Sequence, residues 1–119
     1  YGTGGYGGAG LSNSITGILD YYAGGGAGSG GHDVGGIGGG GYDSDGSRNG
    51  GDNYGGGGAG NNATSDGGKG GRGVVIIAYS ASYAPITTIP VTLTYTYSTS
   101  SRAGYHVYQF KSGSGTISW

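Results

Sequence analysis

Residues 67–79 read Gly-Gly-Lys-Gly-Gly-Arg-Gly-Val-Val-Ile-Ile-Ala-Tyr, and they join two stretches of chain with different physical properties. Upstream of this point glycine dominates, because all but three of the chain's 35 glycines lie in residues 1–73. Downstream, residues 74–119 are rich in the β-branched and aromatic residues that favour strands. The sequence therefore predicts two domains, a glycine-rich segment over residues 1–73 and a β-strand segment over residues 74–119.

The overall composition excludes several classes of protein. The chain has 119 residues, of which 9% are charged, whereas an average globular protein has about 25%. It contains no cysteine, which excludes disulfides, thiolate metal sites and a cysteine nucleophile. The net charge of −1 argues against nucleic acid as a partner, and no apolar run approaches the length of a membrane span. Because the chain starts at Tyr1, we expect a processed product or a piece of something longer.

The glycines of the first segment keep a three-residue register over short stretches. The registers are Gly2, Gly5 and Gly8; Gly25, Gly28 and Gly31; Gly35, Gly38 and Gly41; and Gly67, Gly70 and Gly73. Three residues per turn is the period of an extended polyproline-II-type helix, and glycine on one edge lets such helices approach until backbone N–H meets backbone C=O. We therefore expect several short antiparallel polyglycine-II-type helices, joined by polar turns at residues 42–49 and 61–66.

A flexible glycine linker is the alternative interpretation of this segment. Large apolar residues interrupt the glycines, and a solvated linker does not carry them. These residues are Leu11, Ile15, Ile18, Leu19, Tyr21, Tyr22, Val34 and Ile37. They favour ordered packing, with no helix expected beyond a single turn near residues 11–19.

The second segment has the pattern of short antiparallel strands. Residues 74–79 form an apolar run that predicts a strand buried on both faces, and residues 91–98 alternate between apolar and polar side chains. Residues 105–110 predict a further strand, and residues 116–119 would return as its hairpin partner after a turn. Such a thin sheet has open edges, so we expect other chains to complete it.

The templates of enzyme sites fail in this sequence. The spaced glycines of residues 26–31 match a dinucleotide-binding pattern by chance, because no strand precedes them and no helix follows. The two histidines, His32 and His106, are interpreted as polar surface residues that no neighbour orients against a nucleophile. We expect no enzyme activity, no catalytic residue and no organic cofactor.

An acidic cluster in the first segment offers the only metal candidates. Asp43, Asp45 and Asp52 lie close together in sequence, and carboxylate oxygens are ligands for Ca²⁺. The spacing departs from a calcium-binding loop, because Gly41 occupies the first ligand position and the terminal glutamate is absent. A polar turn is therefore the preferred interpretation, with Ca²⁺ as the alternative.

Several tyrosines sit among the glycines, where neighbouring residues cannot bury them. Tyrosine combined with Gly, Ser, Asn and Asp is a typical composition of recognition loops, since it joins a rigid aromatic contact to adaptable polar groups. The best candidates for contact with a receptor are Tyr42 and Tyr54, with the adjacent Asp43 and Asn53. The tyrosines of the strand segment are expected to pack across strands.

Three stretches of the chain resemble the glycine-rich domains of bacteriophage tail-fibre and related virion proteins. Residues 11–28 are similar to the Ser/Ile-Thr-Gly segment of that family running into Tyr-Ala-Gly-Gly-Gly. Residues 67–79 resemble its Gly-Gly-x-Gly-Gly-x-Gly-Ile/Val-Val-Ile-Ile-x-Tyr signature, and residues 105–119 look like its Phe-Thr-x-Ser-Gly-Thr-Phe-Thr strand pair. The last piece usually opens a repeat in the family, whereas here it closes the chain.

The resemblance implies a virion or extracellular location and a role in host-surface attachment or in the body of a fibre. The implied partners are further copies of the chain or other fibre proteins, and a bacterial surface glycan or outer-membrane protein. No catalytic residue is carried over. The alternative function is a subunit of a self-assembling extracellular filament, in which Tyr42 and Tyr54 would be buried between copies. An ice-binding protein is a more distant alternative, because residues 42–66 lack a regular repeated face.

Overall fold

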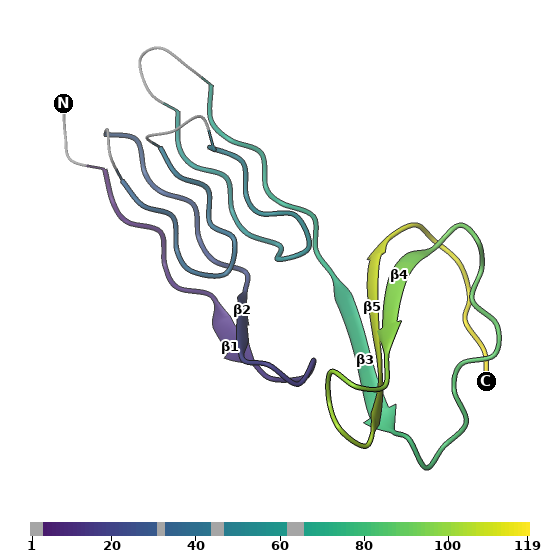
Figure 1. Cartoon of the computed structure of the whole chain (residues 1–119). Helices are drawn as coiled ribbons and strands as arrows, with labels where there is room; N and C mark the ends of the chain where they lie inside the picture. Colours follow the sequence, from purple (N-terminus) through teal and green to yellow (C-terminus); the bar gives the residue numbers. More distant parts are fainter. Residues whose placement is uncertain (1–3, 31–32, 44–46, 62–65) are drawn as a thin grey trace. The chain divides into compact units, whose positions relative to one another are not determined.

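The computed structural model describes residues 4–30, 33–43, 47–61 and 66–119, and the chain divides into two compact units. The first unit comprises Tyr1–Asn13 and Asp20–Gly73, and the second comprises Ser14–Leu19 and Val74–Trp119. All the regular structure in the described ranges is β, arranged as two small antiparallel sheets (Figure 1). The expectation of a mostly β and irregular chain is confirmed at this level.

A short hairpin lies where the sequence suggested a helical turn. Strands β1 (Leu11–Asn13) and β2 (Asp20–Tyr22) pair antiparallel, with Leu11 opposite Tyr22. Gly17 has a φ angle of 99°, which an L-residue rarely adopts, and its N–H donates to the Ser14 carbonyl at 2.9 Å. The left-handed glycine turns the chain back on itself, so residues 11–19 do not form the helical turn.

The rest of the first unit consists of extended segments that lie side by side without forming strands (Figure 1). Backbone hydrogen bonds between them recur at every third residue. Antiparallel neighbours are joined by Gly25 N–H to Gly8 O at 2.8 Å and Gly28 N–H to Gly5 O at 2.7 Å. Parallel neighbours are joined by Gly7 N–H to Val34 O, Gly10 N–H to Ile37 O, Gly57 N–H to Gly24 O and Gly60 N–H to Ala27 O. Gly24 N–H also donates to Gly38 O, and Ala27 N–H donates to Gly41 O. Residues 24–28 therefore bond to three neighbouring segments, more than the two that a β-strand can have.

Burial follows the same three-residue spacing, and the interior is mostly backbone. Buried positions with this spacing include Gly24 and Ala27; Gly35, Gly38 and Gly41; and Gly56 and Ala59, while Gly40, Asp43 and Gly50 are buried as well. A Cβ built on Gly26 would collide with the Gly58 carbonyl, and one built on Gly36 would collide with the Gly8 carbonyl. Glycine is needed here because segments this close leave no volume for a side chain.

The second unit is built on a three-stranded sheet with the order β3-β5-β4. Strand β5 (Tyr105–Ser112) pairs antiparallel with both β3 (Val75–Ser80) and β4 (Thr94–Ser98). The sequence predicted that residues 74–79 form a strand buried on both faces, and this is wrong. β3 is a partly exposed edge strand, because β5 takes the central position and holds the most buried side chain, Val107.

The C-terminal residues also pair differently from the expectation. Ser118 forms an isolated antiparallel bridge with Thr88, instead of a hairpin with β5. The edges of β5 are already occupied by β3 and β4, so β5 has no free backbone groups for a third partner.

One face of this sheet is aromatic. It carries Tyr79 of β3, Tyr95 and Tyr97 of β4, and His106, Tyr108 and Phe110 of β5. Tyr97 stacks on Tyr108 with ring centroids 4.5 Å apart, and the Ile86 N–H donates to the Tyr108 hydroxyl at 3.1 Å. Tyr95, Tyr97 and Tyr108 therefore pack across strands, as expected, whereas the Tyr105 ring lies under the Arg102 guanidinium.

Candidate functional site

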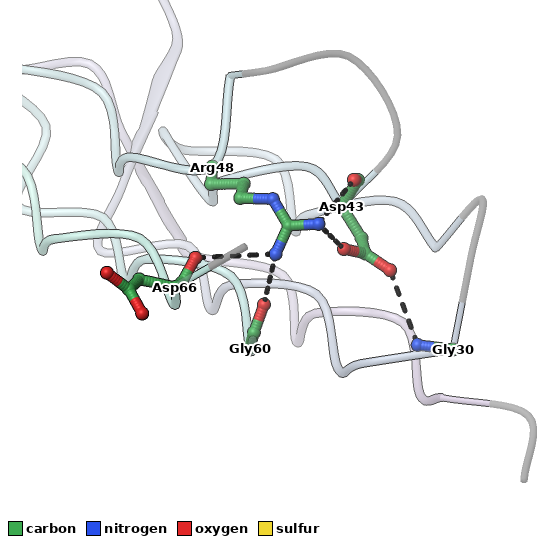
Figure 2. Close-up of polar contacts among 5 residues, drawn as sticks. All are labelled: Gly30, Asp43, Arg48, Gly60 and Asp66. Atoms are coloured by element: carbon green, nitrogen blue, oxygen red, sulfur yellow. Dashed lines mark hydrogen bonds and ion pairs between the residues drawn. The ribbon is translucent and has the colours of Figure 1, made fainter. Parts of the chain in front are cut away.

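A buried ion pair holds the first of the predicted recognition turns. The Asp43 side chain is fully buried, and its Oδ1 lies 2.6 Å from Nη2 of Arg48 (Figure 2). The same Nη2 donates to the Asp43 carbonyl at 3.3 Å, and Nη1 donates to the carbonyls of Gly60 at 3.0 Å and Asp66 at 3.5 Å. Asp43 Oδ2 accepts from the Gly30 N–H at 3.3 Å. The pair thus ties together four parts of the chain that are distant in sequence.

The four predicted receptor-contact residues separate into two pairs. The Asp43 carboxylate, next to Tyr42, accepts a hydrogen bond from the Gly30 N–H. The backbone carbonyl of Tyr54, next to Asn53, accepts a hydrogen bond from the Ala23 N–H at 2.8 Å. Ala23 and Gly30 lie at opposite ends of one extended segment. The two candidate turns therefore lie at opposite ends of the first unit and cannot form one contact surface.

The turn of Tyr42 has an exposed tyrosine followed directly by a buried aspartate. Tyr42 is 44% exposed, and its N–H donates to the Ser47 carbonyl at 3.1 Å. Asp43 is 5% exposed and is fully used by Arg48 and Gly30. At this end Tyr42 is exposed to solvent, whereas Asp43 is an internal support of the turn.

The turn of Asn53 and Tyr54 is anchored differently. Asn53 has a φ of 67°, in the left-handed region that asparagine tolerates better than most residues. The Tyr54 ring lies 5.8 Å from the Tyr22 ring and is 38% exposed. Burial raises the pKa of the Tyr22 hydroxyl, with further contributions from Asp20 and Tyr54. Tyr54 therefore presents part of its ring while the rest covers Tyr22.

The acidic residues proposed for Ca²⁺ are held apart. Asp43 pairs with Arg48, whereas Asp52 lies beside the other turn, accepts from the Arg72 N–H at 3.1 Å and lies 3.9 Å from Arg72 Nε. Asp45 falls outside the described residues. Within the ranges that the structure describes, no three side chains of His, Cys, Asp or Glu form a group able to hold a metal ion.

His106 is not the surface residue that the sequence suggested. It is buried on the aromatic face, with Nδ1 2.7 Å from the Tyr97 hydroxyl and Nε2 3.1 Å from the Tyr83 carbonyl. Because a carbonyl only accepts, Nε2 of the neutral ring carries the proton and the Tyr97 hydroxyl donates to Nδ1. The alternation of β5 already placed His106 beside Tyr108, and that was the signal for burial. The second histidine, His32, falls outside the described residues.

Comparison with known proteins leaves the function to be argued from these residues. No family model matches the chain, no curated protein matches its sequence, and no solved structure matches it. A separate observation is that none of the residues placed by the structure belongs to a helix long and apolar enough to cross a membrane.

Proposed function

We propose that the extended segments of residues 1–73 are polyglycine-II-type helices packed against one another. The three-residue recurrence of both the hydrogen bonds and the buried positions supports this assignment. Each helix has three edges, so an inner helix can bond to neighbours on several sides. The product is a scaffold whose rigidity comes from backbone groups.

On this scaffold, we propose that the chain is a non-enzymatic component of a phage tail fibre that attaches to the host surface. The observation that carries the proposal is the pair of tyrosine turns, Tyr42 and Asn53–Tyr54, held in place at the ends of a backbone-packed unit. A fixed support lowers the entropy that a recognition loop loses on binding. The partner is a bacterial surface glycan or an outer-membrane protein, and the location is the virion or the extracellular space.

Binding of the labelled full-length chain to a panel of bacterial strains tests this function. Tyr42→Ala and Tyr54→Ala each remove the tyrosine at one end of the first unit. The variant that changes the receptor-contacting end should lose at least tenfold in binding. Tyr83→Ala is the matched control, because Tyr83 is 70% exposed and lies in the second unit. Binding that survives both substitutions, in variants that remain folded, would contradict the proposal.

A filament subunit is the second candidate, and the edges of the three-stranded sheet favour it. Neither β3 nor β4 contains a charged residue or a proline. Such residues usually prevent an exposed edge strand from pairing with another chain. Electron microscopy of the purified chain distinguishes the candidates, because long regular polymers are expected only of a filament subunit.

A further inference from the structure

Two segments of the first unit contain glycines that the chain's own packing does not require. A Cβ built on Gly5 or Gly8 meets no atom within 4 Å, and neither residue has a left-handed φ angle. On residues 66–73, a Cβ on Gly67 or Gly70 would make only ordinary contacts, at 3.4 Å and 3.7 Å. By contrast, a Cβ on the adjacent Gly7 would collide with the Gly25 carbonyl.

The same glycines carry backbone groups without partners in the described chain. The N–H groups of Gly5 and Gly8 donate to no described residue, although their carbonyls accept from Gly28 and Gly25. The N–H and C=O groups of Gly67 and Gly70 are likewise unbonded to any residue that the structure places. Rows of unpaired donors and acceptors at a fixed spacing form an open edge, comparable to the edge of a β-sheet.

Exposed apolar side chains occur on the first of these segments and on its neighbour. Tyr6 is 77% exposed and Leu11 is 79% exposed, while Val34 and Ile37 are 43% and 57% exposed on the adjoining segment. Hydrogen bonds from Gly7 and Gly10 hold the two segments together. Residues 4–11 and 34–42 contain no charge. An uncharged apolar patch of this kind marks an interaction surface.

We propose that the edge formed by residues 4–11 binds the edge formed by residues 66–73 of a second copy of the chain. The occupant must bring glycine at every third residue, so that backbones can meet, and free carbonyls for the Gly5 and Gly8 N–H groups. Residues 66–73 supply both features through Gly67 and Gly70. Because the two edges differ, the contact is head-to-tail and can be repeated from one copy to the next. This inference rests on the proposed glycine-helix packing and is independent of host attachment.

Sedimentation velocity of the full chain over a range of concentrations tests the interface. The unmodified chain should increase in mass beyond a dimer as its concentration rises. Gly5→Val/Gly8→Val and Gly67→Val/Gly70→Val should each remain monomeric alone, because each lacks one of the two edges. An equimolar mixture of the two variants should stop at a dimer, since each supplies the edge that the other lacks.

Controls keep this outcome separate from unfolding and from failure of the packing assignment. Both double variants should keep the circular dichroism spectrum and the melting temperature of the unmodified chain, whereas Gly7→Val should lose them. If Gly7→Val and Gly8→Val melt alike, the glycine-helix packing itself is wrong. If the variants are folded but associate as the unmodified chain does, or if the unmodified chain stays monomeric, the interface is overturned.

Discussion

Arg48 and Asp43 form an ion pair with Nη2 and Oδ1 2.6 Å apart, in which the Asp43 side chain is fully buried and the Arg48 side chain is 12% exposed. The remaining guanidinium contacts go to backbone carbonyls, and the second carboxylate oxygen accepts from a backbone N–H. A buried pair with this many hydrogen bonds makes the turn depend on both partners. Removal of either partner leaves the other charge buried without compensation.

We therefore expect Asp43→Asn or Arg48→Met to destabilise the chain by about 3–5 kcal/mol. Asp52→Asn is the matched control, because the Asp52–Arg72 pair is exposed and should contribute at most about 1 kcal/mol. Urea denaturation of the three variants measures the difference. Equal losses for Asp43→Asn and Asp52→Asn would show that burial does not govern this pair.

The glycine interior should reject even a methyl group. Gly26→Ala places a Cβ against the Gly58 carbonyl, and relieving that contact should cost about 3 kcal/mol or more. Gly73→Ala is the control, because a Cβ there meets nothing within 4 Å and a residue other than glycine restricts the unfolded chain. Thermal denaturation should show a lower midpoint for the first variant and no decrease for the second.

Among the residues that the structure describes, two other than glycine hold left-handed backbone conformations, and their substitution should have opposite effects. Ala23 has a φ of 61°, so Ala23→Gly should relieve strain and raise stability by about 0.5–1 kcal/mol. Asn53→Val should lower it by about 1–2 kcal/mol, because a β-branched residue fits this conformation poorly. Asn53→Gly should show no such loss, because glycine adopts this conformation readily. Differential scanning calorimetry of the three variants measures these changes in stability.

The stability of the second unit should decline in alkaline solution. Burial raises the pKa of Tyr108 to about 12 from its ordinary value of 10.0, and the neighbouring Tyr79 adds to the shift. Between pH 10 and 12 the unfolded chain releases this proton while the folded chain keeps it. The contribution is therefore complete below pH 10 and falls by about 2–3 kcal/mol as the pH rises through 12.

Denaturation at pH 9 and pH 11.5, with ultraviolet titration of the tyrosines, checks this decline. Tyr108→Phe should lose stability at pH 9, because the buried Ile86 N–H loses its acceptor, and should show a smaller further loss at pH 11.5. An unchanged pH dependence in Tyr108→Phe would assign the effect to another tyrosine.

The sequence predicted those features that depend on local pattern. The three-residue register of Gly35, Gly38 and Gly41 coincides with buried positions, whereas Gly5 and Gly8, and Gly67, Gly70 and Gly73, are exposed. The alternation of Tyr95 and Tyr97 coincides with the aromatic face. Strand order could not be predicted in this way, because it depends on which strand finds two partners. β5 is the central strand, so β3 lies at an edge and is not buried on both faces as expected. Because both edges of β5 are occupied, residues 116–119 do not form the expected hairpin with it.

The candidate site was predicted by residue type but not by arrangement. Tyr42 and Tyr54 are both exposed at turns. Nothing in their spacing along the sequence indicated that the two turns lie at opposite ends of the first unit. Asp43 was predicted to contact a receptor because it adjoins Tyr42, whereas its carboxylate is buried against Arg48. Arg48 is the only cation upstream of Lys69, among six aspartates, and this was the available signal.

The backbone interior of the first unit has a thermal consequence. Unfolding of an ordinary domain exposes apolar surface and gives a large positive heat-capacity change, which curves its stability with temperature. Among the described residues of the first unit, the buried apolar side chains are Ala27 and Ala59, and most of the remaining buried surface is peptide, whose exposure lowers the heat capacity. Its stability curve should therefore be unusually flat, with little weakening in the cold and a gradual decline on heating.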